Sequence, residues 1–374
     1  MHRRSSHVHQ LLAALSYGDA ISNEALAIQR HLRGAGFESD IFAEGIHPRM
    51  ARLARPLWQY EQVSSAQTVC LFHFSIGSAA SRLIYRAPDR LVSIYHNITP
   101  GEWFLGFHQH LAGLCYHGRR ELLAFAPRTE LGLADSEFNR RELERAGFSR
   151  TAVLPIVHEL SALGSRPSAV ARRMWADGRV NVLFVGRIIP NKKIDDLIRV
   201  FALYQRHLQP HSRLLLVGDY RGHERYQGRL QEMVRALGVQ EVVFTGHVDD
   251  DDLRACYAAA DLFLCLSEHE GYCVPLVEAM AASLPVVAYD AGAVAETLRG
   301  GGLLLRDKDP AAVAEVVHAV LTQPELRRSI LEGQGRVVED LRRTDFRALL
   351  LDRLGSVLEN GGVPREDHPS GKQE

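Results

Sequence analysis

Two of the glutamates in the stretch SEHEGYCVPLVEAMA, residues 267–281, stand on either side of a turn that begins with glycine. Glu270 and Glu278 flank a segment that contains Gly271 and Pro275. Paired carboxylates could be the general acid and base of a glycoside hydrolase, in which the two carboxyl groups lie roughly 5 to 9.5 Å apart across one bond. Alternatively, they could be unrelated, one a solvated loop acid and the other a helix acid.

The residues around the pair predict a strand, a turn and a helix. The apolar run DLFLCLS before Glu270 is typical of a strand buried on both faces, and Pro275 suits the first turn of the following helix. Glu270 would therefore lie just past the carboxyl end of a strand, and Glu278 near the start of a helix. Parallel sheets bind their ligands at this edge.

A helix that starts here would present backbone N–H groups to a ligand. Those of Tyr272, Cys273 and Val274 would form an anion site at the helix N-terminus, and Gly271 would let a ligand approach the backbone closely. Glu278 could then accept hydrogen bonds from the two vicinal hydroxyls of a ribose. An acid–base pair has no need of an anion site, so the stretch favours a nucleotide-sugar cradle over a hydrolase pair.

A second stretch, VLFVGRIIPNKKIDDLI, repeats the order of strand, glycine turn and helix, and it adds cations. Arg187 follows the predicted strand, and Lys192 and Lys193 precede the helix. Cations at the carboxyl edge of a sheet could stabilise the charge that develops on a departing diphosphate. The alternative is that they are solvated loop cations.

Along the whole chain, short apolar runs alternate with helix-period segments, which is typical of α/β domains with parallel sheets. Apolar residues at helical spacing predict amphipathic helices over 230–237 and 313–320. The alternation occurs twice, so we expect two Rossmann-like domains that face each other across a cleft. The runs are VHQLLAALS, DIFAE, TVCLFHF, RLVSIYHN, LGLADS and TAVLPI in the first half, and VNVLFVG, RLLLVG, EVVFTG, DLFLCLS and PVVAYD in the second.

The pattern divides the chain into five parts. Residues 1–160 form an N-terminal Rossmann-like domain, expected to bind the acceptor, and residues 180–340 form a C-terminal one, expected to bind the nucleotide sugar. Residues 161–179 contain Gly, Ser and Pro without a strand pattern, so they are the expected linker. Residues 341–360 are expected to be a helix that packs back on the first domain, and the polar residues 361–374 a disordered tail.

Composition excludes several classes of protein. The chain has 374 residues, of which 46% are hydrophobic and 24% charged, so it is long enough for two globular domains. A net charge of -1 gives no overall field that would attract nucleic acid. The five cysteines include no C-x-x-C pair, so they suggest neither a disulfide framework nor a zinc site, and a reducing cytosol fits them best. The N-terminal apolar run is too short for a signal peptide or a membrane span.

Taken together, these motifs resemble the retaining glycosyltransferases of family 4, which have the two-domain GT-B fold. The resemblance runs from about Val180 to Pro310. It rests on VGRIIPNKK for the family's G-R-x-x-P-x-K-G, on EGYCVPLVEAMA for E-G-F-G-L-P-x-x-E-A-M-A, and on LLLVGD, VVFTGHVDDDDLRACYAAADLFLCLS and LPVVAYDAGAVAETL. The sequence departs from the family where Lys193 replaces a usual Gly, YCV replaces F-G-L, and ASLP replaces C-G-T-P.

The resemblance implies roles for the candidate residues of the second half. Arg187 and Lys192 would hold the diphosphate, and Glu278 would bind the ribose. Glu270 and the backbone from Gly271 to Cys273 would touch the transferred sugar. Because the YCV departure lines that sugar, the resemblance does not imply which sugar is transferred. The other residues expected to contact the donor are Gly186, Tyr272, Val274, His247 and Val248.

The first half resembles the family more weakly. Gly18 and Asp19, in SYGDAISNEALAIQRHL, are candidates for contact with the phosphates or the acceptor through the backbone. The alternative is a Gly-Asp turn that caps a helix. His96 ends the run SIYHNITP, and in the family a His at this place often contacts the donor sugar or the reacting centre.

The resemblance also implies the chemistry. The transferred sugar would keep its α configuration, through front-face attack in which the leaving phosphate accepts the acceptor's proton. No cofactor is expected beyond the nucleotide-sugar co-substrate, which carries UDP or GDP, with UDP favoured, and no metal. The run Asp249 to Asp252 could be mistaken for a metal site, but its position before a helix favours helix N-terminal charge.

The expected acceptor is a glycan, a lipid-linked sugar or a small molecule, and the expected location is the cytosol, including the inner face of a membrane. Trp103 follows His96 on a predicted loop, so it is a candidate platform for the acceptor, with Glu102 beside it. The alternative is that the aromatic residues here pack under a helix. Two other functions stay open: a nucleotide-sugar epimerase of the same fold, which needs no acceptor, and a non-catalytic sugar-nucleotide binding protein.

Overall fold

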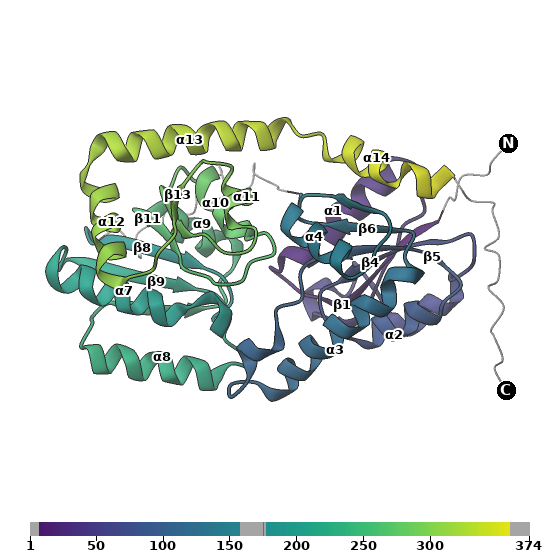
Figure 1. The fold of residues 1–374 in the computed structure, drawn as a ribbon, viewed down its shortest axis with the longest axis horizontal. Helices are drawn as coiled ribbons and strands as arrows, with labels where there is room; N and C mark the ends of the chain where they lie inside the picture. Colours follow the sequence, from purple (N-terminus) through teal and green to yellow (C-terminus); the bar gives the residue numbers. More distant parts are fainter. Residues whose placement is uncertain (1–6, 158–174, 176, 360–374) are drawn as a thin grey trace.

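The computed structural model describes residues 7–157, 175 and 177–359. Two parallel sheets, each covered by helices on both faces, lie side by side (Figure 1). The prediction of two parallel-sheet α/β domains is confirmed. The expected linker and tail lie almost wholly outside the described residues, so those two predictions stay untested.

The N-terminal sheet has seven strands in the order β3-β2-β1-β4-β5-β6-β7. All of its pairings are parallel. The strands are β1 (Val8–Leu15), β2 (Ile41–Ile46), β3 (Arg55–Pro56), β4 (Val69–Phe74), β5 (Arg90–Tyr95), β6 (Leu131–Ala134) and β7 (Thr151–Val153). The helices are α1 (Ala20–Gly34), α2 (Ala79–Arg86), α3 (Gln109–Phe125) and α4 (Glu137–Arg145), with short 3-10 turns η1 (Pro48–Met50), η2 (Leu57–Gln62), η3 (Gly101–Phe104) and η4 (Ala126–Arg128).

The C-terminal sheet has six parallel strands in the order β10-β9-β8-β11-β12-β13. These are β8 (Val180–Val185), β9 (Ser212–Val217), β10 (Val242–Gly246), β11 (Leu262–Cys265), β12 (Val286–Tyr289) and β13 (Leu303–Leu305). Around them lie η5 (Pro190–Lys192), α7 (Ile194–His207), α8 (Glu224–Leu237), α9 (Asp250–Ala259), α10 (Val274–Ala281), α11 (Val294–Leu298), α12 (Pro310–Thr322) and α13 (Pro324–Arg343).

Burial explains why the apolar runs are strands. Every residue of β4, VCLFHF, and of β11, LFLC, is buried, because helices cover both faces of each sheet. The predicted helical stripes also lie on the core side: Leu230 of α8 and Val313, Val317 and Val320 of α12 are buried. The runs missed only β3 and β13, edge strands too short to show an apolar pattern.

The last described helix packs on the N-terminal domain. In Figure 1, α13 runs along the C-terminal domain and α14 (Phe346–Glu359) lies on the N-terminal one. Leu350, Leu354 and Val357 of α14 are fully buried in a core that also contains Val8 of β1 and Ile28 of α1. None of the described helices is long and apolar enough to cross a membrane.

Candidate active site

The two predicted strand–turn–helix stretches meet at the carboxyl edge of the C-terminal sheet. Lys192, the last residue of η5, places its ammonium nitrogen 2.7 Å from each carboxylate oxygen of Glu270, which follows β11. The Glu270 side chain is 6% exposed and that of Lys192 is 20% exposed. Burial alone would lower the pKa of Lys192, but the Glu270 carboxylate outweighs this effect, and the pKa is raised. The cation therefore stays charged at neutral pH.

Asn191 fixes these two segments to each other. Its amide nitrogen donates to the His269 carbonyl at 3.2 Å, and its backbone carbonyl accepts from the Glu268 N–H at 2.9 Å. Asn191 is only 2% exposed. Sequence analysis missed this residue, because its role depends on a loop about 80 residues further along the chain.

Lys193 is not part of the site. Its ammonium lies 3.2 Å from the Asp195 carboxylate and 3.6 Å from Asp196, both in the first turn of α7. Lys192 therefore contacts Glu270, whereas Lys193 contacts the acidic residues at the start of α7.

Arg187 is exposed and reaches toward the N-terminal domain. Its guanidinium lies 3.5 Å from Nε2 of His223, the residue just before α8. Burial, followed by the charges of Arg187 and His108, lowers the pKa of His223 to about 4. The neutral imidazole can thus lie beside the guanidinium without repulsion. His223 carried no recognisable signal in the sequence.

A cavity of about 310 Å³ lies beside Arg187, between the two domains. The N-terminal domain contributes Asp19, Ser75 and Thr99 to its wall, and the C-terminal domain contributes Arg187 and Ile189. The cavity therefore offers polar groups of both domains to one ligand.

The start of α10 has the predicted geometry. Pro275 lies in its first turn, Val274 is its first residue, and no described side chain caps it. The first N–H groups of a helix have no partner within the helix, so they point outward as donors. Glu278, on the same helix, accepts a hydrogen bond of 2.7 Å from the Tyr257 hydroxyl. Burial raises the pKa of Glu278.

Gly271 has a different role from the one expected. A Cβ atom at this position would lie 2.6 Å from Cβ of Asn97 and 3.3 Å from the His96 carbonyl oxygen. The space is thus taken by the N-terminal domain rather than left open to a ligand. The Ser136 hydroxyl also donates to the Gly271 carbonyl at 2.7 Å. Gly271 therefore allows the two domains to touch.

His96 lies inside the N-terminal domain, with 1% of its side chain exposed. Its Nε2 is 2.8 Å from Nδ1 of His73, and its Nδ1 is 3.1 Å from the Asp135 carboxylate. Both ring nitrogens are engaged by the protein, so the ring would have to leave this network to contact a donor sugar. The ring therefore lies in a buried layer of the N-terminal domain, and its expected contact with the donor sugar stays a prediction.

The turn after β1 of the N-terminal domain approaches the turn after β10 of the C-terminal domain. A Cβ atom at Gly18 would lie 3.0 Å from the ring of His247, and Tyr17 packs edge-on against the same ring. Asp19 caps α1 by accepting from the Ser22 N–H at 3.1 Å, as the alternative interpretation proposed. Val248 packs against the core of the C-terminal domain.

Gly186 follows β8 and lies against a second glycine. A Cβ atom at Gly218 would fall 1.9 Å from the Gly186 carbonyl oxygen, so the turns after β8 and β9 pack backbone to backbone. This contact sets the position of Arg187, the next residue.

Trp103 is half-buried and packs against the core of the N-terminal domain. Phe104 is 2% exposed, and Phe107 reaches across to the Tyr226 ring of α8 at 5.2 Å between centroids. The segment therefore links the two domains. Phe104 is packed in the core, as the alternative interpretation expected. The role of Trp103 as a platform for the acceptor stays a prediction.

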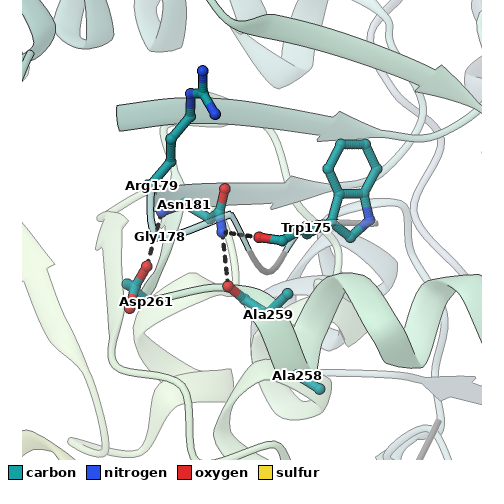
Figure 2. Close-up of a pocket in the computed structure, with 7 residues that line it drawn as sticks. All are labelled: Trp175, Gly178, Arg179, Asn181, Ala258, Ala259 and Asp261. Carbon is teal, nitrogen blue, oxygen red and sulfur yellow. Dashed lines mark hydrogen bonds between the residues drawn. The ribbon is translucent and has the colours of Figure 1, made fainter. Parts of the chain in front are cut away.

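A second hollow lies at the opposite edge of the C-terminal sheet (Figure 2). The Asn181 amide there donates to the carbonyls of Trp175 at 3.3 Å and Ala259 at 3.0 Å, and Asp261 accepts from the Asn181 N–H. These groups satisfy one another at the amino ends of the strands, away from Arg187. The candidate site is therefore the interdomain one.

Residues 168–334 match the family described as Glycosyl transferases group 1. The C-terminal domain therefore matches this family. The prediction of family 4 is thereby confirmed. Each of the three departures from the family pattern includes one residue with a left-handed backbone conformation. The φ angle is 53° at Lys193, 73° at Cys273 and 57° at Ser283. The turns keep the conformation of the family's usual glycines although the side chains differ.

Curated relatives share the matched half of the chain. A GDP-mannose-dependent alpha-mannosyltransferase of Mycobacterium tuberculosis is 39% identical over 186 residues, 46% of this chain and 45% of that protein. A D-inositol 3-phosphate glycosyltransferase of Nocardia farcinica is 33% identical over 219 residues, 56% of this chain and 49% of that protein. The chain thus spans about half the length of the curated relatives it matches.

Solved structures match over nearly the whole chain. Sucrose-phosphate synthase from Thermosynechococcus elongatus has a TM-score of 0.74 at 19% identity and covers 94% of this chain and 99% of that one. WaaG, a glycosyltransferase involved in lipopolysaccharide biosynthesis, has a TM-score of 0.69 at 15% identity, with 94% and 100% covered. Both matches show the two-domain GT-B fold, as predicted.

Proposed function

We propose that this protein is a retaining, metal-independent hexosyltransferase that moves a sugar from a nucleotide-sugar donor to an acceptor hydroxyl. The observation that carries the proposal is the buried ion pair of Lys192 with Glu270, beside Arg187 and the start of α10. A cation, a carboxylate and outward N–H groups at one sheet edge suit a sugar diphosphate.

The donor would occupy the C-terminal half of the cleft. Arg187 and Lys192 would bind the diphosphate and stabilise the charge that grows on it. Lys192 would exchange part of its contact with Glu270 for a phosphate oxygen, which leaves Glu270 available to accept from sugar hydroxyls. Glu278 would accept from the ribose, and the N–H groups at the start of α10, near Cys273, would face the donor.

GDP-mannose is the donor to test first, because one relative is named as dependent on it and another is named mannosylfructose-phosphate synthase. UDP-glucose is the second, because a protein of the same fold, Anabaena HepE, is described in complex with it. A thermal-shift panel of GDP, UDP, ADP and dTDP separates the bases. A nucleotide at 100 times its dissociation constant stabilises the folded protein by about 2.7 kcal/mol.

The acceptor would enter the cavity beside Arg187. Asp19, Ser75 and Thr99 would accept from or donate to its hydroxyls, and Phe104 and Ile189 would contact its apolar face. This mixture suits a glycan, the sugar of a lipid-linked acceptor or a small polyol. The five reduced cysteines support a cytosolic location.

In the transfer step, the bond between the sugar and the diphosphate breaks while the acceptor oxygen attacks from the same face. The acceptor proton passes to the leaving phosphate oxygen, so no protein base is needed. The test is the product: incubation of an α-linked donor with a panel of acceptors should give an α-linked glycoside, seen in the anomeric proton coupling. A β-linked product, or donor epimerisation without acceptor, would contradict the proposal.

A further inference from the structure

Two thiols lie next to Glu270 in the described part of the chain. Cys265 is the last residue of β11 and is 1% exposed, and Cys273 precedes α10 and is half-buried. One ligating atom of each, together with a Glu270 carboxylate oxygen, forms a group whose members all lie within 4.8 Å of one another. Three potential metal ligands thus converge at the edge of the cleft.

The turn between β11 and α10 brings the two cysteines together. Cys273 takes a left-handed conformation, φ 73°, at the position where family members usually have glycine. Such a conformation is unfavourable for a residue with a side chain and easy for glycine. The Cys273 thiol therefore sits on a strained backbone, at a position where glycine would have no strain.

The two thiols interact with each other as well as with Glu270. A hydrogen bond from the Cys273 thiol lowers the pKa of Cys265, and the same bond raises the pKa of Cys273. The Cys265 sulfur also lies 3.3 Å from the Ser267 hydroxyl. The two sulfurs, the Ser267 hydroxyl and the Glu270 carboxylate thus lie together at the end of β11.

We propose that Cys265, Cys273 and Glu270 form a binding site for a thiophilic divalent cation of the Zn²⁺ type. Two sulfurs and one carboxylate oxygen are ligands that Zn²⁺ accepts, and a fourth position is left for water or a substrate oxygen. Zinc–sulfur bonds of about 2.3 Å place tetrahedral ligand atoms roughly 3.5 to 4 Å apart. Small side-chain rotations would bring the three atoms from within 4.8 Å to this spacing.

Charge balance favours the ion in this place. Two thiolates and the Glu270 carboxylate carry three negative charges, which the ion and the Lys192 ammonium would neutralise together. The ammonium now lies 2.7 Å from Glu270, so the ion would have to share that carboxylate with it. Binding would also release the thiol protons, and the affinity should therefore rise with pH.

The metal would affect the donor. This consequence rests on the proposed function, in which Glu270 faces the transferred sugar and Lys192 the diphosphate. An ion that holds Glu270 would compete with the donor for it. We therefore expect Zn²⁺ to inhibit transfer, whereas the binding of the metal itself does not depend on any activity.

The test is a titration of the full-length protein with Co²⁺ under anaerobic conditions, with a phosphine to keep thiols reduced. Thiolate ligation should produce a sulfur-to-cobalt charge-transfer band that saturates at one ion per chain, and added Zn²⁺ should bleach it because Zn²⁺ binds more tightly. The variant Cys273→Gly should abolish the band and weaken Zn²⁺ binding at least tenfold. It relieves the left-handed backbone strain, so its loss of the band cannot be attributed to misfolding.

The matched control is Cys256→Ala, which removes a thiol of α9 in the same domain. It should keep the band at full intensity. The proposal is overturned if the wild-type protein shows no charge-transfer band, or if the band survives in Cys273→Gly. Neither result would touch the proposed transfer, which is measured without added metal.

Discussion

Arg187 is the cation on which the proposed transfer chemistry depends, because it borders the interdomain cavity and makes no ion pair with any described residue. Charge on the diphosphate grows toward the transition state, so a group that stabilises it acts more on turnover than on binding. We expect Arg187→Ala to lower kcat about 100-fold and to raise the donor KM only a few-fold. Steady-state kinetics with saturating acceptor measure both.

Lys193→Gly is the matched control for this prediction. It removes a cation six residues further along the same segment, and it keeps the left-handed turn, φ 53°. Since Lys193 contacts Asp195 and Asp196 rather than Glu270, its kcat should stay within about threefold of wild type. A loss confined to KM in Arg187→Ala would argue against its role in the transition state.

Glu278 is expected to bind the ribose. The variant Glu278→Gln removes a charged acceptor but retains an oxygen for the Tyr257 hydroxyl, which now donates at 2.7 Å. Nucleotide affinity should therefore fall by roughly ten-fold or more, the worth of one charged hydrogen bond, with little change in Tm. Calorimetric titration with the best nucleotide of the panel measures the affinity. Unchanged affinity would remove Glu278 from the nucleotide site.

Glu24 gives a prediction about pH. It lies fully buried 3.5 Å from the His96 ring, and burial, followed by the Asp135 charge, raises its pKa from 4.5 to about 8. A raised folded pKa stabilises the protein below pH 4.5, and this contribution is lost as the pH rises through about 8. The Glu24→Gln variant has no proton to lose, so its free energy of unfolding should fall less than that of wild type over this window.

Urea unfolding at several pH values between these limits tests the prediction. Each unit of pKa shift corresponds to roughly 1.4 kcal/mol, so the difference in slope should be measurable. Burial lowers the pKa of His96, but Asp135 and Glu24 outweigh it and raise the pKa to about 9, so His96 adds a loss of stability from about pH 6.5 upward. This loss should be smaller in the variant, which lacks the Glu24 charge. Identical pH profiles for the two proteins would mean that Glu24 is ionised in the folded state.

At the scale of elements, the turns keep the family's backbone without its glycines. Ser283 is an exposed residue with φ 57° between α10 and β12, where the family usually has Gly. The left-handed conformation is unfavourable for serine and easy for glycine. We expect Ser283→Gly to raise the free energy of unfolding by about 1 kcal/mol, net of the greater flexibility of glycine in the unfolded chain.

Thermal and denaturant unfolding of the variant measure this change. Gly238 is already glycine at a left-handed position, φ 64°, after α8, so Gly238→Ala is the reverse control and should destabilise by a similar amount. If Ser283→Gly were less stable than wild type, the serine side chain would be contributing an interaction that outweighs the backbone strain.

The elements also show how much of the structure could be predicted from the sequence. The strands at the centre of both sheets could be predicted from apolar runs, since each such strand is buried on both faces. The positions of Arg187, Lys192, Glu270 and Glu278 followed from the same local order of strand, turn and helix. Cys265 and Cys273 could not be paired, because they are eight residues apart with no motif, and only the turn brings their sulfurs together.

Other site residues depend on contacts between distant segments, which local pattern does not encode. Asn191 acts on the loop of His269, and His223 lies beside Arg187 from the start of another helix. The contact of Gly271 with the other domain was missed for the same reason, because Asn97, which fills the space beside it, is distant in the sequence.

At the scale of the whole molecule, the two domains are joined by polar contacts around the candidate site. Glu296, of α11 in the C-terminal domain, accepts from the N–H groups of Glu137 at 2.6 Å and Phe138 at 3.3 Å. These are the first N–H groups of α4, so a carboxylate of one domain caps a helix of the other. The Nε2 atom of His269 lies 2.5 Å from the Asn97 amide oxygen, in the same contact region. The two domains are therefore in direct contact beside the candidate site.

Gly271 permits this close approach of the two domains, because it has no side chain to strike Asn97. In Gly271→Ala the new methyl group would lie 2.6 Å from Cβ of Asn97, a distance that real Cβ contacts do not show, so the domains must move apart. Closure assembles groups of both domains around the reacting centre. We therefore expect a larger radius of gyration in solution scattering and a kcat at least tenfold lower, with nucleotide affinity retained because Arg187, Lys192 and Glu278 all belong to one domain.

A second substitution shows whether the contact itself is responsible. Asn97 has φ 65°, so Asn97→Gly suits its backbone and removes the Cβ atom that the alanine would strike. The double variant Gly271→Ala/Asn97→Gly should recover part of the compact radius, although Asn139 and the His96 carbonyl oxygen still crowd the methyl group at 3.1 and 3.3 Å. If the single variant is as compact as wild type and yet inactive, then Gly271 acts on the ligand, as first expected from the sequence, and not on the approach of the domains.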